Sequence, residues 1–186
     1  MQQAHSRDEW LMAEVAGGKR QHLEALIRRY ANPLLTFIRR MVGDQHHSEE
    51  LFQEVFLAVW VKRRQYQFPR PFKAWLYAIA VNKCRASFRG RALPAFFGKE
   101  EDLAHPPATA EPLPVEKMVA TETAALVASA VELLPPQQRA VVVLRVWDGL
   151  SYAQIAEIVG RSEGTVRSNM HHGLAAMRKY LEPRLG

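Results

Sequence analysis

The chain has 186 residues, enough for one medium domain or two small ones, and its 48% apolar share is usual for a folded soluble protein. No apolar run approaches the roughly 18 residues of a membrane span, and the polar N-terminus lacks the apolar core of a signal peptide. The single cysteine, Cys84, excludes an internal disulfide. These features predict a cytoplasmic protein without stable membrane insertion.

Charge is distributed in three blocks along the chain. Residues 1–91 carry 16 Lys and Arg against 8 Asp and Glu, residues 92–132 carry 2 against 7, and residues 133–186 carry 7 against 4. The formal net charge is +6. Two basic blocks separated by an acidic one indicate two modules that bind a polyanion such as nucleic acid. Uneven charge is also common in basic proteins that have no such role.

Helical periodicity dominates the first part of the chain. Residues 8–16 and 19–42 carry apolar side chains at helical spacing, with Pro33 as a point where the second helix kinks or restarts. Gly43-Asp44 ends that helix. The next helix is expected over about 47–64, with Ser48 or Asp44 as its cap. Its core face is broad and consists of Leu51, Phe52, Val55, Phe56 and Val59.

The other side of this third helix mixes acids with aliphatic side chains. It carries Glu50, Gln53, Glu54, Leu57 and Val61. Such a surface suits a protein partner that offers arginines around an apolar centre. A solvated face with scattered apolar residues would have the same composition, so the residues alone leave both interpretations open.

Aromatic and basic side chains gather in the next segment. Two close prolines forbid a helix over residues 66–71, and a helix is then expected over 72–91 with Trp75 in its core face. Aromatic rings beside a basic helix can stack unpaired bases while arginines hold phosphates. Alternatively, the rings are core and the arginines favour the helix C-terminus. The side chains in question are Tyr66, Phe68, Arg70, Arg85, Arg89 and Arg91.

A segment rich in proline and acids spans residues 92–116 and predicts a flexible or extended linker. Helices are expected over about 115–134 and 137–148. The packing side of the second consists of Val142, Val143, Val146 and Leu150. No strand and no internal repeat is apparent, so we predict an all-α fold. Its parts are an N-terminal domain over 1–91, a linker over 92–117 and a C-terminal domain over 118–186.

Residues 151–179 have the pattern of two helices joined by a tight turn. Ser151 and Gln154 have capping-box spacing, Gly160 supplies a left-handed end, and Ser162 can cap the second helix. An apolar stripe should hold the second helix on its neighbour: Val166, Met170, Leu174, Met177 and Leu181.

The opposite side of that second helix is slim, polar and cationic. No acid follows Glu163 as far as Lys179, and Arg167 and Arg178 flank this side. A face of this kind suits the major groove of DNA, although an ordinary surface helix packed on its neighbour is the alternative. The outward residues are Ser168, His171, His172, Ala175 and Lys179.

Three motifs in this order resemble the sigma-70 family of bacterial sigma factors. The run SEELFQEVFL over 48–57, followed by Trp60, resembles region 2.2, and FKAWLYAIAVN over 72–82 resembles regions 2.3 to 2.4. The run LPPQQR over 134–139, with the motifs over 151–156 and 162–168, resembles region 4. The length and the single short linker are similar to the extracytoplasmic-function group, which keeps only domains 2 and 4.

The resemblance implies a promoter-specificity subunit of RNA polymerase with no catalytic residue, cofactor or metal. Its implied partners are bacterial core RNA polymerase, promoter DNA and an anti-sigma factor. Core polymerase would be bound by Glu50, Gln53, Glu54 and Leu57. The −10 element, with one base flipped from the stack, would be bound by Tyr66, Phe68, Arg70, Asn82, Arg85 and Arg89. The −35 element would be bound by Ser162, Thr165, Arg167, Ser168, His171, His172 and Lys179.

Two other classes of function are alternatives to this one. A stand-alone helix-turn-helix regulator would need only residues 133–186 and would not bind polymerase through 47–64. An enzyme is disfavoured because the sequence has no phosphate-cradling glycine loop and no spaced metal ligands. The pairs His46-His47 and His171-His172 are adjacent rather than four residues apart, and Cys84 is expected to be half-buried.

Overall fold

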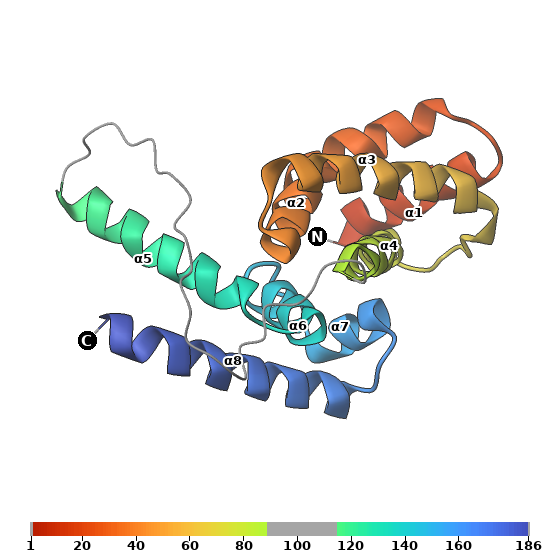
Figure 1. Cartoon of the computed structure of the whole chain (residues 1–186). Helices are drawn as coiled ribbons and strands as arrows, with labels where there is room; N and C mark the ends of the chain where they lie inside the picture. Colours follow the sequence, from red (N-terminus) through yellow and green to blue (C-terminus); the bar gives the residue numbers. More distant parts are fainter. Residues whose placement is uncertain (1, 89–114, 186) are drawn as a thin grey trace.

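The computed structural model describes residues 2–88 and 115–185, and all regular structure in these ranges is helical (Figure 1), which confirms the predicted fold class. In the described ranges, no helix is long and apolar enough to cross a membrane. The N-terminal half contains α1 (Gln2–Ala16), α2 (Gln21–Val42), α3 (Gln45–Lys62), the 3-10 turn η1 (Arg63–Gln65) and α4 (Phe72–Ser87). The C-terminal half contains α5 (Val115–Glu132), α6 (Pro136–Val146), α7 (Tyr152–Val159) and α8 (Glu163–Leu185).

Local sequence signals fix several helix ends in the N-terminal half. α2 continues through Pro33 and ends where Gly43 takes φ 78°, a conformation that favours glycine. Asp44 caps α3, because its side chain accepts a hydrogen bond from the backbone N–H of His47 at 2.6 Å. α4 begins at Phe72, whose N–H donates to the buried carboxylate of Glu9 at 2.9 Å. A residue of α1 therefore satisfies a free donor at the start of α4.

α4 is buried on two sides rather than one. The expected side, with Trp75, Leu76, Ile79 and Ala80, is buried in the N-terminal bundle. A second buried set, at helical spacings of three or four residues, consists of Ala74, Tyr77, Val81 and Cys84. We call this set the second stripe of α4. Cys84 is 0% exposed, so the expectation of a half-buried thiol is wrong, because α4 lies between the two halves of the molecule (Figure 1).

The helix-turn-helix has the expected turns and caps. Ser151 and Gln154 form both hydrogen bonds of a capping box, and Gly160 ends α7 with φ 65°. The Ser162 hydroxyl accepts a hydrogen bond from the N–H of Thr165 at 3.2 Å, as a cap of α8 should.

Two residues that the apolar pattern assigned to the core are exposed. Val146 is 53% exposed because α6 ends there and the chain turns away. Leu174 is 47% exposed, because the buried side of α8 is rotated from the predicted stripe. That buried side consists of Val166, Met170, Gly173, Met177 and Tyr180.

A glycine permits the close approach of α8 to α6. A Cβ built on Gly173 would lie 2.8 Å from Cγ2 of Val142, which is fully buried and β-branched. We expect Gly173→Ala to destabilise the C-terminal half by about 1 kcal/mol, since overpacking exceeds the gain in helix propensity. Chemical denaturation followed by circular dichroism measures this. Gly164→Ala is the matched control on the same helix, with no atom nearer than 3.9 Å, and should not destabilise. Equal midpoints for the two variants would contradict the packing argument.

The two halves pack directly against each other in this structure. α4 lies against α7, and α2 lies against α5 and α6 (Figure 1). α5 begins at Val115, so most of the linker predicted over 92–117 lies outside the described residues. The boundaries 1–91 and 118–186 stay a prediction.

Candidate functional site

The outer side of α3 is an exposed mixture of acids and aliphatic residues. Leu57 and Val61 are 62% and 67% exposed, so the described part of the chain leaves both aliphatic side chains in contact with solvent. The acids beside them are partly paired: the Glu54 carboxylate lies 2.8 Å from Nζ of Lys83, and Glu50 lies 3.5 Å from Nδ1 of His47. We define the α3 face as the exposed residues Glu50, Gln53, Glu54, Leu57 and Val61.

The loop before α4 presents one aromatic ring and hides the other. Phe68 is 61% exposed. Tyr66 is only 7% exposed; its ring packs edge-on against Trp75 at 5.4 Å, and its hydroxyl donates to the carbonyl of Arg70. The expectation that Tyr66 contacts DNA is therefore corrected, because this side chain anchors the loop from inside. Burial raises the pKa of the Tyr66 hydroxyl, which keeps it protonated as a donor.

The polar side of α4 and its loop is already engaged by the C-terminal half. Asn82 is exposed, whereas Arg85 is half-buried. Burial and the nearby Arg161, in the turn after α7, lower the pKa of Arg85. Nε of Arg70 lies 3.3 Å from the carboxylate of Glu157 in α7. Arg89 and Arg91 lie outside the described residues.

The outer side of α8 is exposed and its first arginine is held in place. Arg167 is 61% exposed at its side chain, stacks over the ring of Tyr152 at 4.4 Å and lies 3.5 Å from the carboxylate of Glu163. The hydroxyls of Ser162 and Thr165 are 3.0 Å apart. We define the α8 face as the exposed residues Ser162, Thr165, Arg167, Ser168, His171, His172 and Lys179.

Sequence reasoning missed two residues that organise this half. The guanidinium groups of Arg167 and Arg145 both stack over the ring of Tyr152, the second at 5.0 Å from the ring centre. The apolar periodicity of the sequence does not single out Tyr152. Arg139 is 4% exposed and donates to the carbonyls of Glu132, Leu134 and Met41. Arg139 could have been identified from the sequence because it is the one cation at the start of an apolar run, residues 139 to 144, all of which are buried.

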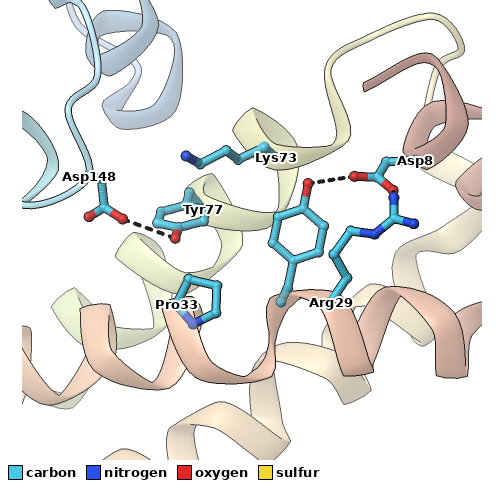
Figure 2. A pocket seen from close by; sticks show the side chains of 7 residues that line it. Asp8, Arg29, Pro33, Lys73, Tyr77 and Asp148 are labelled. Carbon is cyan, nitrogen blue, oxygen red and sulfur yellow. Dashed lines mark hydrogen bonds and ion pairs between the residues drawn. The ribbon is translucent and has the colours of Figure 1, made fainter. Parts of the chain in front are cut away.

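A small cavity of about 250 Å³ lies where the two halves meet (Figure 2). Asp148 reaches into it from the turn after α6, and the hydroxyl of Tyr77 on α4 donates to its carboxylate at 3.2 Å. Burial raises the pKa of Asp148, while Tyr77, Lys73 and Arg40 act in the opposite direction. The cavity contains none of the residues of the α3 face or the α8 face. Within 2–88 and 115–185, no group of three His, Cys, Asp or Glu side chains suits a metal ion.

Comparison with known proteins identifies the two halves of the chain. Sigma-70 region 2 matches residues 26–93, and the region 4 family matches residues 124–177. The RNA polymerase sigma-H factor of Pseudomonas aeruginosa is 30% identical over 186 residues, covering 96% of this chain and 96% of the relative. The ECF RNA polymerase sigma factor SigE of Mycolicibacterium smegmatis is 35% identical over 85% of this chain, which spans 61% of that relative's length.

Solved structures share the fold. CnrH, in complex with the cytosolic domain of CnrY, superposes with a TM-score of 0.71 at 24% identity, covering 95% of this chain and 98% of CnrH. RpoE of Bartonella quintana, in complex with the anti-sigma factor NepR, gives a TM-score of 0.62 at 22% identity, covering 86% and 96%. Together, the two matched regions in their order and these relatives show that this chain belongs to the extracytoplasmic-function group of the sigma-70 family of RNA polymerase sigma factors.

Proposed function

We propose that this chain is an alternative sigma factor that binds core RNA polymerase, recognises −35 and −10 elements and helps to melt the promoter. It acts in the cytoplasm and performs no catalytic step itself. One observation carries this proposal most directly: a single chain exposes an acidic and aliphatic face on α3 and a cationic face on α8. A regulator that only binds DNA needs the second face and has no use for the first.

The α3 face is the part that binds polymerase. Leu57 and Val61 offer an exposed apolar centre, and Glu50 and Glu54 place negative charge beside it, toward the start of α3. A central apolar contact supplies affinity, whereas the surrounding charges select a partner of opposite charge. The partner surface should therefore carry arginines or lysines around an apolar patch.

The −10 element is bound by the loop before α4 and by the polar side of α4. Phe68 offers an exposed ring that can stack an unpaired base, and Asn82 and Arg85 can reach the base edge and the phosphates. Tyr66 acts indirectly, because its hydroxyl and ring hold the loop that carries Phe68. Stacking of an unpaired base on Phe68 is the means of melting that we propose.

The −35 element is bound by the α8 face in the major groove. We expect Arg167→Ala to weaken binding at a matching −35 duplex by about 1–3 kcal/mol, because Arg167 is an exposed guanidinium near the start of α8 and is held by Tyr152. Fluorescence anisotropy with specific and random duplexes measures this loss. Arg184→Ala removes an arginine from the other end of the same helix and should have little effect. An equal loss on both duplexes would assign Arg167 to a phosphate and contradict a base contact.

Reconstituted transcription tests the proposal as a whole. Core polymerase supplemented with this chain should start transcription from genomic DNA fragments, and sequenced 5′ ends should share two upstream elements. If the chain binds DNA but starts no transcripts and does not bind core polymerase, the function is that of a stand-alone helix-turn-helix regulator.

We also infer control by an anti-sigma factor. RpoE, which has this fold, was solved with the anti-sigma factor NepR. Neighbouring genes co-expressed with this chain should include one whose product binds it and stops transcription in the reconstituted system. A search in which every binding product leaves transcription unchanged would contradict this inference.

A further inference from the structure

Helix α1 carries two buried acids in consecutive positions. Asp8 and Glu9 are only 4% and 6% exposed, and a buried carboxylate is costly unless it has partners. Asp8 accepts a hydrogen bond from the hydroxyl of Tyr30 at 2.9 Å and is paired with Arg29 of α2 (Figure 2). The Glu9 carboxylate accepts from the backbone N–H of Phe72 at 2.9 Å. One acid therefore holds α1 on α2, and the other holds the start of α4 on α1.

Glu9 acts as a cap of α4 that comes from another helix. The residue before α4 is Pro71, which makes no side-chain capping bond. The first N–H groups of a helix need acceptors and carry partial positive charge, and the carboxylate of Glu9 supplies both an acceptor and a negative charge. Phe72 is 0% exposed, so water cannot replace this acceptor when it is removed.

Aromatic contacts extend this support from α4 into the loop before it. The ring of Phe72 packs edge-on against Tyr30 at 5.3 Å and against Tyr66 at 6.4 Å. The Tyr66 hydroxyl in turn donates to the carbonyl of Arg70. Burial raises the pKa of Tyr66, and the charge of Glu9 acts in the same direction, so the hydroxyl stays protonated as a donor. Glu9 and Tyr66 thus belong to one buried group that holds both ends of the loop.

The exposed part of the loop depends on these ends for its position. Residues 67–71 are all exposed, and the prolines among them have no backbone N–H to donate. Within the loop, the N–H of Arg70 donates to the carbonyl of Gln67 at 2.8 Å, a bond that shapes the loop without placing it on the domain. The ion pair of Arg70 with Glu157 of α7 is exposed, and such pairs contribute little. The place of the Phe68 ring is therefore set by the two buried ends.

We propose that Glu9 is a positioning residue for promoter melting, because through Phe72 it holds the loop where Phe68 can receive an unpaired base. This inference rests on the proposed function, in which Phe68 stacks that base. It gives α1 a part in binding the −10 element that needs no contact between α1 and DNA. The α3 face and the α8 face contain no residue of α1, so a change at Glu9 should affect neither of their partners.

Hydrogen exchange of the full chain tests the support of the loop without DNA. Glu9→Ala should speed amide exchange in the peptide 66–72 about tenfold or more, because the Phe72 N–H loses its acceptor. Glu9→Gln keeps an acceptor on a side chain of the same length and should exchange as slowly as the parent chain. Val15→Ala is the matched control, since it removes buried methyl groups near the other end of α1. Equal exchange rates in Glu9→Ala and Val15→Ala would overturn the proposal.

A double-mutant cycle tests whether Glu9 acts through Phe68. The probe is a labelled single-stranded oligonucleotide with the −10 element found by sequencing the 5′ ends, and the protein is the full chain assembled with core polymerase. Phe68→Ala should weaken binding about tenfold by removing one stacked base, and Glu9→Ala should weaken it about fivefold. The combined variant should bind as Phe68→Ala does, because no ring is left to misplace. Losses that multiply to about fiftyfold would indicate general structural damage and overturn the proposal.

Two further comparisons separate this inference from the proposed function. Glu9→Gln should bind the oligonucleotide within about twofold of the parent, and Glu9→Ala should bind a −35 duplex as the parent does. If Phe68→Ala weakens oligonucleotide binding and Glu9→Ala does not, the proposed function stands and the positioning role of Glu9 is overturned. If Phe68→Ala has no effect, the proposed role of the loop in melting has failed and the inference falls with it, while the exchange rates still decide whether Glu9 holds the loop.

Discussion

The double variant Glu50→Lys with Glu54→Lys is expected to lower the affinity for core polymerase at least 100-fold, or about 3 kcal/mol. Both carboxylates lie within two helical turns before the exposed Leu57 on the α3 face, so reversal replaces attraction by repulsion beside the apolar centre. Reversal at Glu54 also places a second amine next to that of Lys83, which in the parent chain lies 2.8 Å from the Glu54 carboxylate. Fluorescence titration of labelled chain with core polymerase, at fixed salt, measures the affinity.

A charge-matched control separates local contact from overall charge. Glu24→Lys with Glu182→Lys changes the net charge by the same amount on α2 and α8, at exposed positions outside the α3 face. This control should bind polymerase within about twofold of the parent chain, because remote surface charges at moderate salt are screened. If both double variants lose affinity equally, or neither does, the α3 face is not where polymerase binds.

Helix ends were predictable because their signals are local. Asp44, Ser151 with Gln154, and Gly160 act through hydrogen bonds to residues within three or four positions, or through a single backbone angle. The register of a helix against its neighbour is different. Leu174 fits an apolar stripe as well as Gly173 does, and only the approach of Val142 decides that the glycine lies inside. A sequence pattern contains no information about that approach.

The candidate surfaces were predictable where they lie on regular helices and were not predictable in the loop before α4. The α3 face and the α8 face lie on regular helices, so the helical period predicts which side chains point outward. Tyr66 lies in a loop, where no period exists, and its burial depends on Phe72 and Trp75 of the following helix. The second stripe of α4 was missed for another reason: Tyr77 and Cys84 are buried where α4 meets both α2 and the C-terminal half, and a division into two separate modules gave no sign of that meeting.

The largest loss of stability is expected from Arg139→Met. The guanidinium is 4% exposed and its donors serve the carbonyls of Glu132 and Leu134 at the end of α5, as well as that of Met41 at the end of α2. Methionine fills a similar volume but leaves these carbonyl acceptors without a donor. Each carbonyl that water cannot reach then costs about 1–3 kcal/mol of folding stability. We expect a total loss of about 3 kcal/mol, which lowers the unfolding midpoint of the C-terminal half by on the order of 15 °C.

Arg139→Lys decides whether the loss comes from charge or from geometry. Burial lowers the pKa of Arg139, so keeping the charged side chain inside is costly. Its contribution to stability must therefore come from the planar guanidinium, whose fixed N–H groups donate to several carbonyls at once. Lysine keeps the charge but cannot donate along the same fixed directions. It should therefore recover less than half of the stability lost in Arg139→Met, as measured by thermal unfolding. Full recovery by lysine would mean that a positive charge alone is what this site needs, and the assignment to the fork would be wrong.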